Sequence, residues 1–165
     1  MATQRTLTTG EIALVKAAFG ARIDPRRVKL SDGPGSQPLA HLAFTKGNPA
    51  ITVGSTVYFK TDYCPDFSAA GRNRKSFIHE MTHVWQYRDL GMTMFFLRYG
   101  ADLLNVGGNP DDMYVYTPGQ TRFDEAMIEQ QAEMVGDYSE ARWQRNADRE
   151  ALLRINIAGS GIYGL

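Results

Sequence analysis

Two of the three histidines in this 165-residue chain, His79 and His83, stand four positions apart, and Glu80 lies between them. This is the H-E-x-x-H pattern, in which two imidazoles bind a zinc ion and the glutamate acts as general base. Residues four apart on a helix are neighbours, so both imidazoles can reach one ion at about 2.0–2.1 Å. Glu80 lies about 100° further round the helix, where it can contact a water on that ion. The spacing therefore predicts a catalytic site with one zinc ion per chain.

A catalytic zinc site needs a third protein ligand and an open fourth position. The chain offers its remaining histidine, His41, or a run of carboxylates near its far end. The members of this run are spaced four apart and are Glu125, Glu129, Glu133 and Asp137. Such a run lies on one face of a helix, and its alternative interpretation is an acidic face in contact with water. On the residues alone several ligands stay open, in the order Glu129, Glu133 and Glu125, with His41 as the minor option.

Hydrolysis also needs a hydrogen-bond donor for the developing oxyanion. The candidates are Tyr114, Tyr116 and Tyr138, followed by Arg122 and His41. Each has packing or surface exposure as its alternative role. We expect Tyr138 to be the donor, because it comes one residue after the carboxylate run.

The motif and the carboxylate run together resemble a known family. Phe77–Gln86, followed at a distance by Glu129–Glu133, resembles the zincin metallopeptidases of the gluzincin type. Over most of residues 7–140 the chain is similar to a compact bacterial zincin group whose members are described as Vgr-related or Rhs-type secretion proteins. The resemblance implies a zincin-like fold with Glu129 as the third ligand. Glu133 would then be an alternative ligand or the hydrogen-bond acceptor for a ligating histidine.

Two functions follow as expectations. The first is a zinc-dependent metallopeptidase that hydrolyses peptide bonds with Glu80 as general base, either as a general enzyme or as a toxin-like effector. The second is a zinc-stabilised accessory or binding module of a bacterial secretion or toxin system, with little or no peptidase activity. Glu80 favours the first, because a structural metal site needs no base. The expected partners are a peptide or protein substrate and a larger toxin or secretion-system protein.

Composition excludes other classes. The chain carries 18 basic and 18 acidic residues, whereas a nucleic-acid binder usually shows a basic excess. Residues 1–75 hold 11 Lys/Arg and 5 Asp/Glu, and residues 76–165 hold 7 and 13, so the motif lies in the acidic half. A single cysteine, Cys64, cannot form an internal disulfide. No export signal or membrane span is visible, so we expect a cytoplasmic protein, with signal-independent export left open.

The hydrophobic pattern predicts an α+β fold, in which a small antiparallel or mixed sheet packs against the motif helix and a second long C-terminal helix. We expect one domain over residues 1–158 and a flexible tail over 159–165. The expected helices are 8–20, 74–90, 92–104 and 123–145, and the expected strands are 27–30, 50–53 and 56–60, with a long loop at 105–121.

Overall fold

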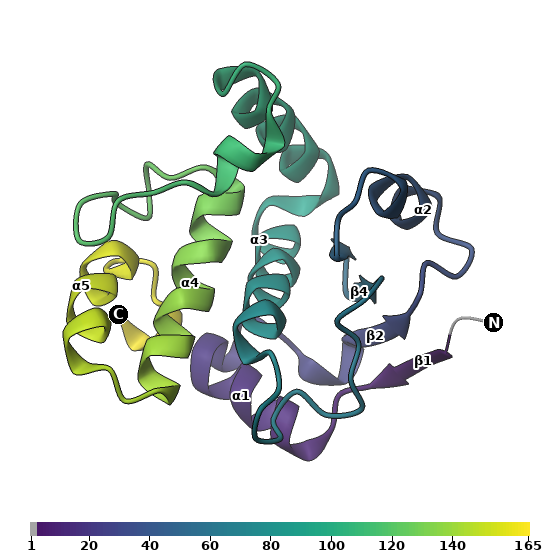
Figure 1. Ribbon diagram of the computed structural model, residues 1–165, viewed down its shortest axis with the longest axis horizontal. Coiled ribbons are helices and arrows are strands. Elements are labelled where there is room, and N and C mark those ends of the chain that lie inside the picture. Colours follow the sequence, from purple (N-terminus) through teal and green to yellow (C-terminus); the bar gives the residue numbers. More distant parts are fainter. Residues whose placement is uncertain (1–2) are drawn as a thin grey trace.

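The sheet is mixed, with the strand order β1-β2-β4-β3, in the computed structural model, which describes residues 3–165 (Figure 1). β1 is antiparallel to β2, β2 is parallel to β4, and β4 is antiparallel to β3. The predicted α+β class with a small mixed sheet is therefore confirmed, as is the hairpin formed by the last two strands. The strands are β1 (Thr3–Thr6), β2 (Lys29–Asp32), β3 (Ala50–Val53) and β4 (Thr56–Phe59).

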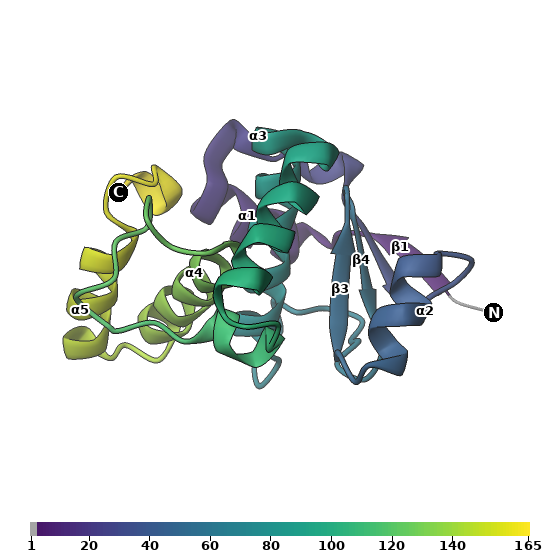
Figure 2. The same cartoon turned by 90° about the horizontal axis from the view of Figure 1, so that it is seen from above.

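Helices cover both faces of this sheet. Figure 2 shows α2 on one side of the sheet and α3 on the other, with α4 and then α5 beyond α3. The helices are α1 (Thr9–Phe19), α2 (Pro38–Thr45), α3 (Arg74–Asn105), α4 (Ile128–Trp143) and α5 (Ala147–Ile157). Short 3-10 turns lie at η1 (Gly20–Arg22), η2 (Pro25–Arg27), η3 (Pro110–Tyr114) and η4 (Ile162–Gly164).

Successive side chains of β4 point to opposite faces of the sheet. Both faces therefore carry apolar residues that a helix must cover. Val57 and Phe59 are fully buried in the main core between the sheet and α3. Tyr58 points to the other face and packs against Ala40 and Phe44 of α2. The sequence did not predict α2, an eight-residue helix whose stability depends on this packing.

The first helix begins with the capping box that the sequence predicts. Thr8 Oγ1 accepts a hydrogen bond from the backbone N–H of Glu11, and the Glu11 carboxylate accepts one from the N–H of Thr8. The same buried carboxylate accepts two hydrogen bonds from Arg5 of β1, at 2.7 and 2.8 Å, and one from the N–H of Phe67. Phe67 in turn stacks on Phe77 of α3, with ring centroids 5.2 Å apart. This corner therefore connects the sheet to the motif helix.

α3 consists of two helical segments joined by a kink at Gly91, whose backbone is non-helical, with φ 76° and ψ 161°. We call residues 74–90 its motif half and residues 92–105 its distal half. The two halves correspond to the two helices predicted from the sequence. No helix within residues 3–165 is both long and apolar enough to span a membrane.

The last predicted helix is wrong in its bounds. The structure has α4 from Ile128 and a separate α5, with a break at Arg145, whose φ is 55°. The N–H of Ile128 donates to Asp102 of α3 at 2.9 Å, so the start of α4 is fixed by a contact distant in sequence. The segment 159–165, expected as a flexible tail, contains Ile162, which is fully buried in the main core.

Candidate metal centre

The residues predicted to bind metal come from two helices that lie side by side, α3 and α4 (Figure 1). His79 and His83 project from the motif half of α3, and Glu129 lies in the first turn of α4. Nε2 of His83 lies 3.2 Å from Nε2 of His79 and 3.1 Å from Oε2 of Glu129. Nε2 of His79 lies 3.3 Å from the same oxygen. The structure thus brings three buried donor atoms around one point.

The spacing of these three atoms fits a tetrahedral ion. Ligand atoms about 2.0–2.1 Å from a tetrahedral zinc are about 3.3 Å from one another. The three measured separations, 3.1, 3.2 and 3.3 Å, agree with this value. Two imidazole nitrogens and one carboxylate oxygen are also the donor set typical of catalytic zinc.

The opposite ring nitrogens show where the two histidines carry their protons. Nδ1 of His79 lies 3.2 Å from Oε2 of Glu133, and Nδ1 of His83 lies 2.8 Å from Oε1 of Gln86. Both partners are acceptors, so each Nδ1 carries the proton and donates. If both imidazoles are neutral, Nε2 of each ring then carries a lone pair. Both of these lone pairs face Oε2 of Glu129. Such a convergence of acceptors is favourable only with a metal ion, or additional protons, between them.

The orientation of Gln86 is set by its own neighbours. Its Nε2 donates to the carbonyl of Ile128 and to Oε1 of Gln131, both at 3.0 Å. Gln131 donates onward to the carbonyl of Phe123 at 2.8 Å. The amide oxygen of Gln86 must therefore face His83, which fixes the tautomer of that ring. A role for Gln86 was not predicted from the sequence, although its position three residues after His83 on the same helix indicates that the two are neighbours.

Glu80 lies beside the cluster and is held by the sheet. Its Oε2 accepts a hydrogen bond of 2.6 Å from the hydroxyl of Thr52, a buried residue of β3. Glu80 lines the same hollow as His79, His83 and Glu129. The carboxylate is therefore placed beside the donor atoms without being one of them.

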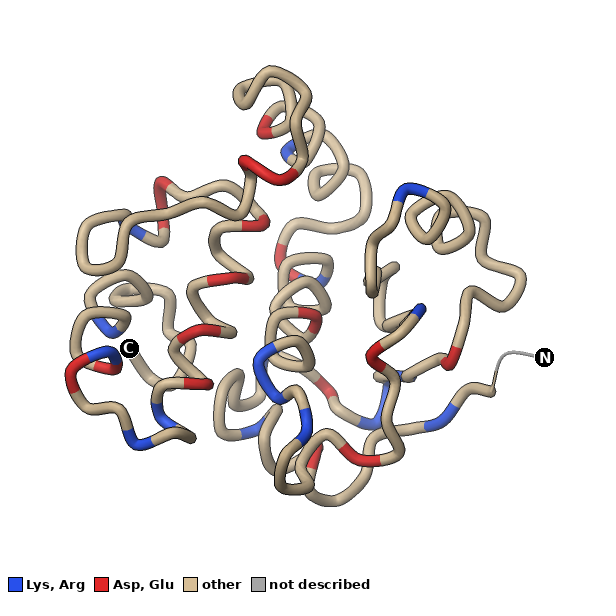
Figure 3. The backbone as a smooth tube through the Cα atoms, viewed as in Figure 1, with Lys and Arg blue, Asp and Glu red and all other residues tan. Residues whose placement is uncertain are grey.

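The remaining carboxylates of the predicted run form ion pairs. Lys75 of α3 contacts Glu133 and also Asp137, the latter at 2.9 Å. Asp137 accepts further hydrogen bonds from Tyr116 at 2.6 Å and from Arg149 at 2.8 Å. Figure 3 shows the acidic residues recurring along α4. Glu133 thus joins Lys75 to the Nδ1 of a predicted ligand, and Asp137 links the same lysine to Tyr116 and Arg149.

The ionisation of the cluster reflects this pairing. Burial lowers the pKa of His79, but the hydrogen bonds that His79 donates to Glu129 and Glu133 outweigh burial and raise this pKa to about 10. Burial raises the pKa of Glu129, but the charge of His83 and the histidine hydrogen bonds hold it far below its usual range. For Glu133, burial is outweighed by hydrogen bonds from His79 and Lys75, which lower the pKa to about 2. The metal-free cluster therefore holds protons that an ion would displace.

The predicted oxyanion donor is not at this site. Tyr138 is buried elsewhere, with its ring against Tyr163 and its hydroxyl 3.4 Å from Glu150 of α5. Tyr114 lies at the cluster instead, and its ring stacks on His79 with centroids 5.9 Å apart. Burial and the charge of Glu129 raise the pKa of Tyr114, so its hydroxyl stays protonated at neutral pH.

The two other alternative ligands also lie outside the cluster. His41 is exposed in α2, with Nε2 2.8 Å from the carbonyl of Gly35. Glu125 precedes α4 and pairs with Arg122 at the surface. Glu125 lies outside the cluster because α4, the helix predicted to carry it, begins only at residue 128.

Comparisons with known proteins identify one family and one relative of known structure. Residues 7–91 match the family model of the eCIS core domain. The Type VI secretion system spike protein VgrG2b of Pseudomonas aeruginosa is 32% identical over 167 residues, covering 94% of this chain and 14% of that protein. The solved effector domain of Pseudomonas aeruginosa VgrG2b matches with a TM-score of 0.64 and 29% identity, covering 94% of this chain and 82% of that one. The predicted resemblance to Vgr-related secretion proteins is thereby confirmed, and the matched family region includes the H-E-x-x-H motif.

Proposed function

Because this chain belongs to the eCIS core domain family, we propose that it acts in a secretion system as an effector that is a zinc-dependent peptidase. Its similarity to a secretion-system effector domain supports the association with secretion. The peptidase activity is proposed from the geometry of the cluster. The zincin-like character of the fold is also part of this proposal.

One observation carries the hydrolytic part of the proposal. Three buried donor atoms from His79, His83 and Glu129 lie within 3.3 Å of one another, and Glu80 lines the same hollow. A metal that only stabilised the fold would need a fourth protein ligand rather than a base. The buried Glu80 forms no salt bridge within residues 3–165, and burying a carboxylate is costly, which favours a role for Glu80 in the chemistry.

The residues divide the chemistry among them. A zinc ion bound by His79, His83 and Glu129 would supply a water of lowered pKa and polarise the scissile carbonyl. The hydrogen bond from Thr52 to Oε2 of Glu80 leaves Oε1 to accept a proton from water and pass it to the leaving amine nitrogen. Tyr114 keeps its proton and donates a hydrogen bond to the oxyanion.

The sheet provides a template for an extended peptide. β3 is at the end of the strand order and pairs only with β4 among residues 3–165, so its second edge has no strand partner. Ala50, Ile51 and Thr52 of β3 line the hollow that contains Glu80. A peptide could therefore add to this edge as a further strand and bring its backbone past the metal ligands.

The second candidate is a zinc-stabilised accessory module. The family membership and the similarity to a secretion-system effector domain support this role more directly than they support the peptidase, which rests on the geometry of the cluster. The two functions differ in one requirement, because the module needs the bound metal but has no use for a proton acceptor at Glu80.

The test compares the wild-type protein with Glu80→Gln. We expect about one zinc per chain in both by elemental analysis, and hydrolysis of fluorescein-labelled casein by the wild type alone. Glu125→Gln is the matched control, because Glu125 is exposed and lies outside the cluster. It should retain both zinc and activity.

Three results would decide between the functions. Equal hydrolysis by wild type and Glu80→Gln would remove Glu80 from the mechanism. One zinc per chain without hydrolysis by the wild type would favour the accessory module. The absence of zinc from the wild type would overturn both candidates.

A further inference from the structure

Two hollows of different character meet at the motif. The first, which we call the apolar groove, has a volume of about 200 Å³ and lies between α2, β3 and the distal half of α3. The second, which we call the polar hollow, has a volume of about 350 Å³ and lies between the start of α3 and α4. Both are lined by His79, Glu80 and Tyr114, so a chain passing the metal ligands would enter one hollow on each side.

The apolar groove has large hydrophobic walls that are open to water. Leu39 and Leu42 of α2 form one wall, and Phe95 and Phe96 of α3 form the other. Leu42 is 54% exposed and Phe96 is 41% exposed. A ligand that covers this surface gains binding free energy in proportion to the apolar area that it removes from water. The groove therefore favours an apolar occupant.

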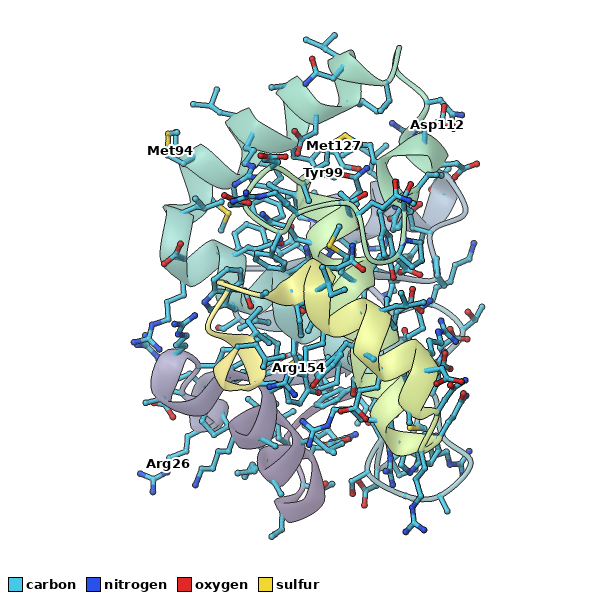
Figure 4. The ribbon with its side chains drawn as sticks, turned by 90° about the vertical axis from the view of Figure 1, so that its left-hand side faces the viewer. Arg26, Met94, Tyr99, Asp112, Met127 and Arg154 are labelled. Atoms are coloured by element: carbon cyan, nitrogen blue, oxygen red, sulfur yellow. The ribbon has the colours of Figure 1, made fainter. Side chains whose placement is uncertain are left out.

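The kink at Gly91 is what creates the second wall. It redirects the distal half so that Phe95 stacks on Tyr87 of the motif half, with ring centroids 3.8 Å apart. Phe95 also meets the ring of His83 edge to face, at 5.9 Å. Met94 of the same half extends outward, whereas Tyr99 lies among the other side chains (Figure 4). The aromatic side of this segment is therefore the one directed at the metal ligands.

Size and charge restrict the occupant further. A volume of about 200 Å³ is below that of drug-sized pockets and suits one large side chain. Outside the cluster and Glu80, the lining of the apolar groove carries a single charged residue, Lys46. A charged side chain in the groove would lose hydration and find a partner only near Lys46, so an uncharged occupant is favoured.

The polar hollow is lined by different groups. Its lining includes Asp62, Asn73, Lys75, Ser76 and Glu133. Lys75 and Glu133 contact each other there, and both signs of charge are present. A polar side chain finds hydrogen-bond partners in this hollow that an apolar one cannot use.

We propose that the chain cleaves extended peptides between a large uncharged apolar residue, held in the apolar groove, and a polar residue, held in the polar hollow. This inference rests on the proposed function and adds the substrate class to it. Leu42 and Phe96 determine specificity on the apolar side. They contact substrate side chains, and they leave the metal ligands unchanged.

The first experiment measures cleavage of an equimolar library of unstructured octapeptides with two adjacent randomised positions, read by mass spectrometry. We expect Phe, Leu, Met or Tyr to be enriched at least about 10-fold on one side of the cut, and polar residues on the other. Leu42→Lys should shift the enrichment on the apolar side towards Asp and Glu. Phe96→Ala should reduce the preference for large over small apolar residues.

The matched control is Leu97→Lys. Leu97 lies on the same half of α3 and is 61% exposed, but it does not line the groove. The profile of Leu97→Lys should equal that of the wild type. Because Leu42, Phe96 and Leu97 are all exposed, we expect the thermal midpoints of the three variants to stay close to the wild-type value.

The second experiment measures binding without turnover. The Glu80→Gln protein, loaded with zinc, is titrated into fluorescein-labelled Gly-Ser-Ala-Phe-Ser-Gly and into a copy with serine in place of phenylalanine. Fluorescence anisotropy should show at least about 10-fold tighter binding of the phenylalanine peptide. Adding Leu42→Lys should abolish that difference.

The outcomes separate this inference from the proposed function. Cleavage without apolar enrichment, or an unchanged profile in Leu42→Lys, would overturn the inference and leave the peptidase standing. Selective binding without any cleavage would support the groove as a peptide site and overturn the peptidase. The absence of both cleavage and selective binding would overturn the two together.

Discussion

Nε2 of His79 lies 3.2 Å from Nε2 of His83, and each ring donates its other nitrogen proton to a different acceptor. Without a metal, a proton must therefore lie on the Nε2 side of the cluster. The pKa of His79, raised to about 10, indicates that this proton is present at neutral pH. Zinc binds neutral imidazole, so binding and protonation compete.

We accordingly predict that zinc binding at pH 7.5 releases at least one proton per ion. Calorimetric titration in two buffers of different ionisation enthalpy measures this number directly. The apparent affinity should rise about 10-fold per pH unit for each proton released, over the range between pH 6.5 and about 10. Equal heats in the two buffers would contradict a protonated His79 in the metal-free protein.

The same raised pKa predicts how the metal-free fold responds to pH. A histidine with a folded pKa above its unfolded value of 6.5 stabilises the fold fully below pH 6.5, and it loses this contribution as the pH rises through about 10. The thermal midpoint of the metal-free protein should therefore fall over this interval. Saturating zinc should reverse the fall, which scanning calorimetry with and without chelator would detect.

Glu129 and Glu133 are predicted to differ in their effect on the metal. Glu129→Ala removes a donor atom and should reduce zinc retention to near zero after dialysis. Glu133→Ala removes only the acceptor for Nδ1 of His79, and such losses weaken metal affinity about 10–100-fold. If the second variant loses zinc and the first keeps it, the ligand assignment is wrong.

Substitutions of Gln86 test the hydrogen bond that Nδ1 of His83 donates to it. Gln86→Leu leaves Nδ1 of His83 without an acceptor, so zinc affinity should fall about 10–100-fold. Gln86→Glu keeps an acceptor for that proton and should recover most of the affinity, although it loses the bonds donated to Ile128 and Gln131. Equal affinities in the two variants would show that Gln86 acts only through packing.

Gly136 is predicted to control the approach of the two ligand-bearing helices. A Cβ at this position would lie 3.1 Å from the carbonyl oxygen of Lys75 and 3.5 Å from Cβ of His79. Gly136→Ala should therefore cost about 1–3 kcal/mol of folding free energy and weaken zinc binding as α3 and α4 separate. The control is Gly100→Ala, where nothing lies within 4 Å of the added atom. Denaturant titration of both variants makes the comparison.

Much of the site could be predicted from local spacing. The H-E-x-x-H pattern determines which side chains share a helix face, and this does not depend on tertiary contacts. Helical phase also limits the partners from α4, because Glu129 and Glu133 are one turn apart. Tyr138 is nine residues from Glu129, which is about 180° around the same helix, so its absence from the cluster could have been read from the sequence.

Other parts depend on contacts that no local pattern records. The start of α4 is set by Asp102, 26 residues away, and this contact excludes Glu125 from the helix. Tyr114 reaches His79 because the loop between the two long helices folds back over the motif. The positions of Thr52 and Gln131 likewise follow from the packing of β3 and α4 on α3.

The match to the family model ends at residue 91, the residue at which α3 changes direction. The positive φ of Gly91 allows residues 92–105 to run in a new direction without rotating the side chains of His79 and His83. Exchanging residues 92–101 after the joint should therefore change the lining of the apolar groove, while Asp102 keeps the start of α4, and with it Glu129, in place. An engineer could alter the occupant of the groove by grafting residues 92–101 alone.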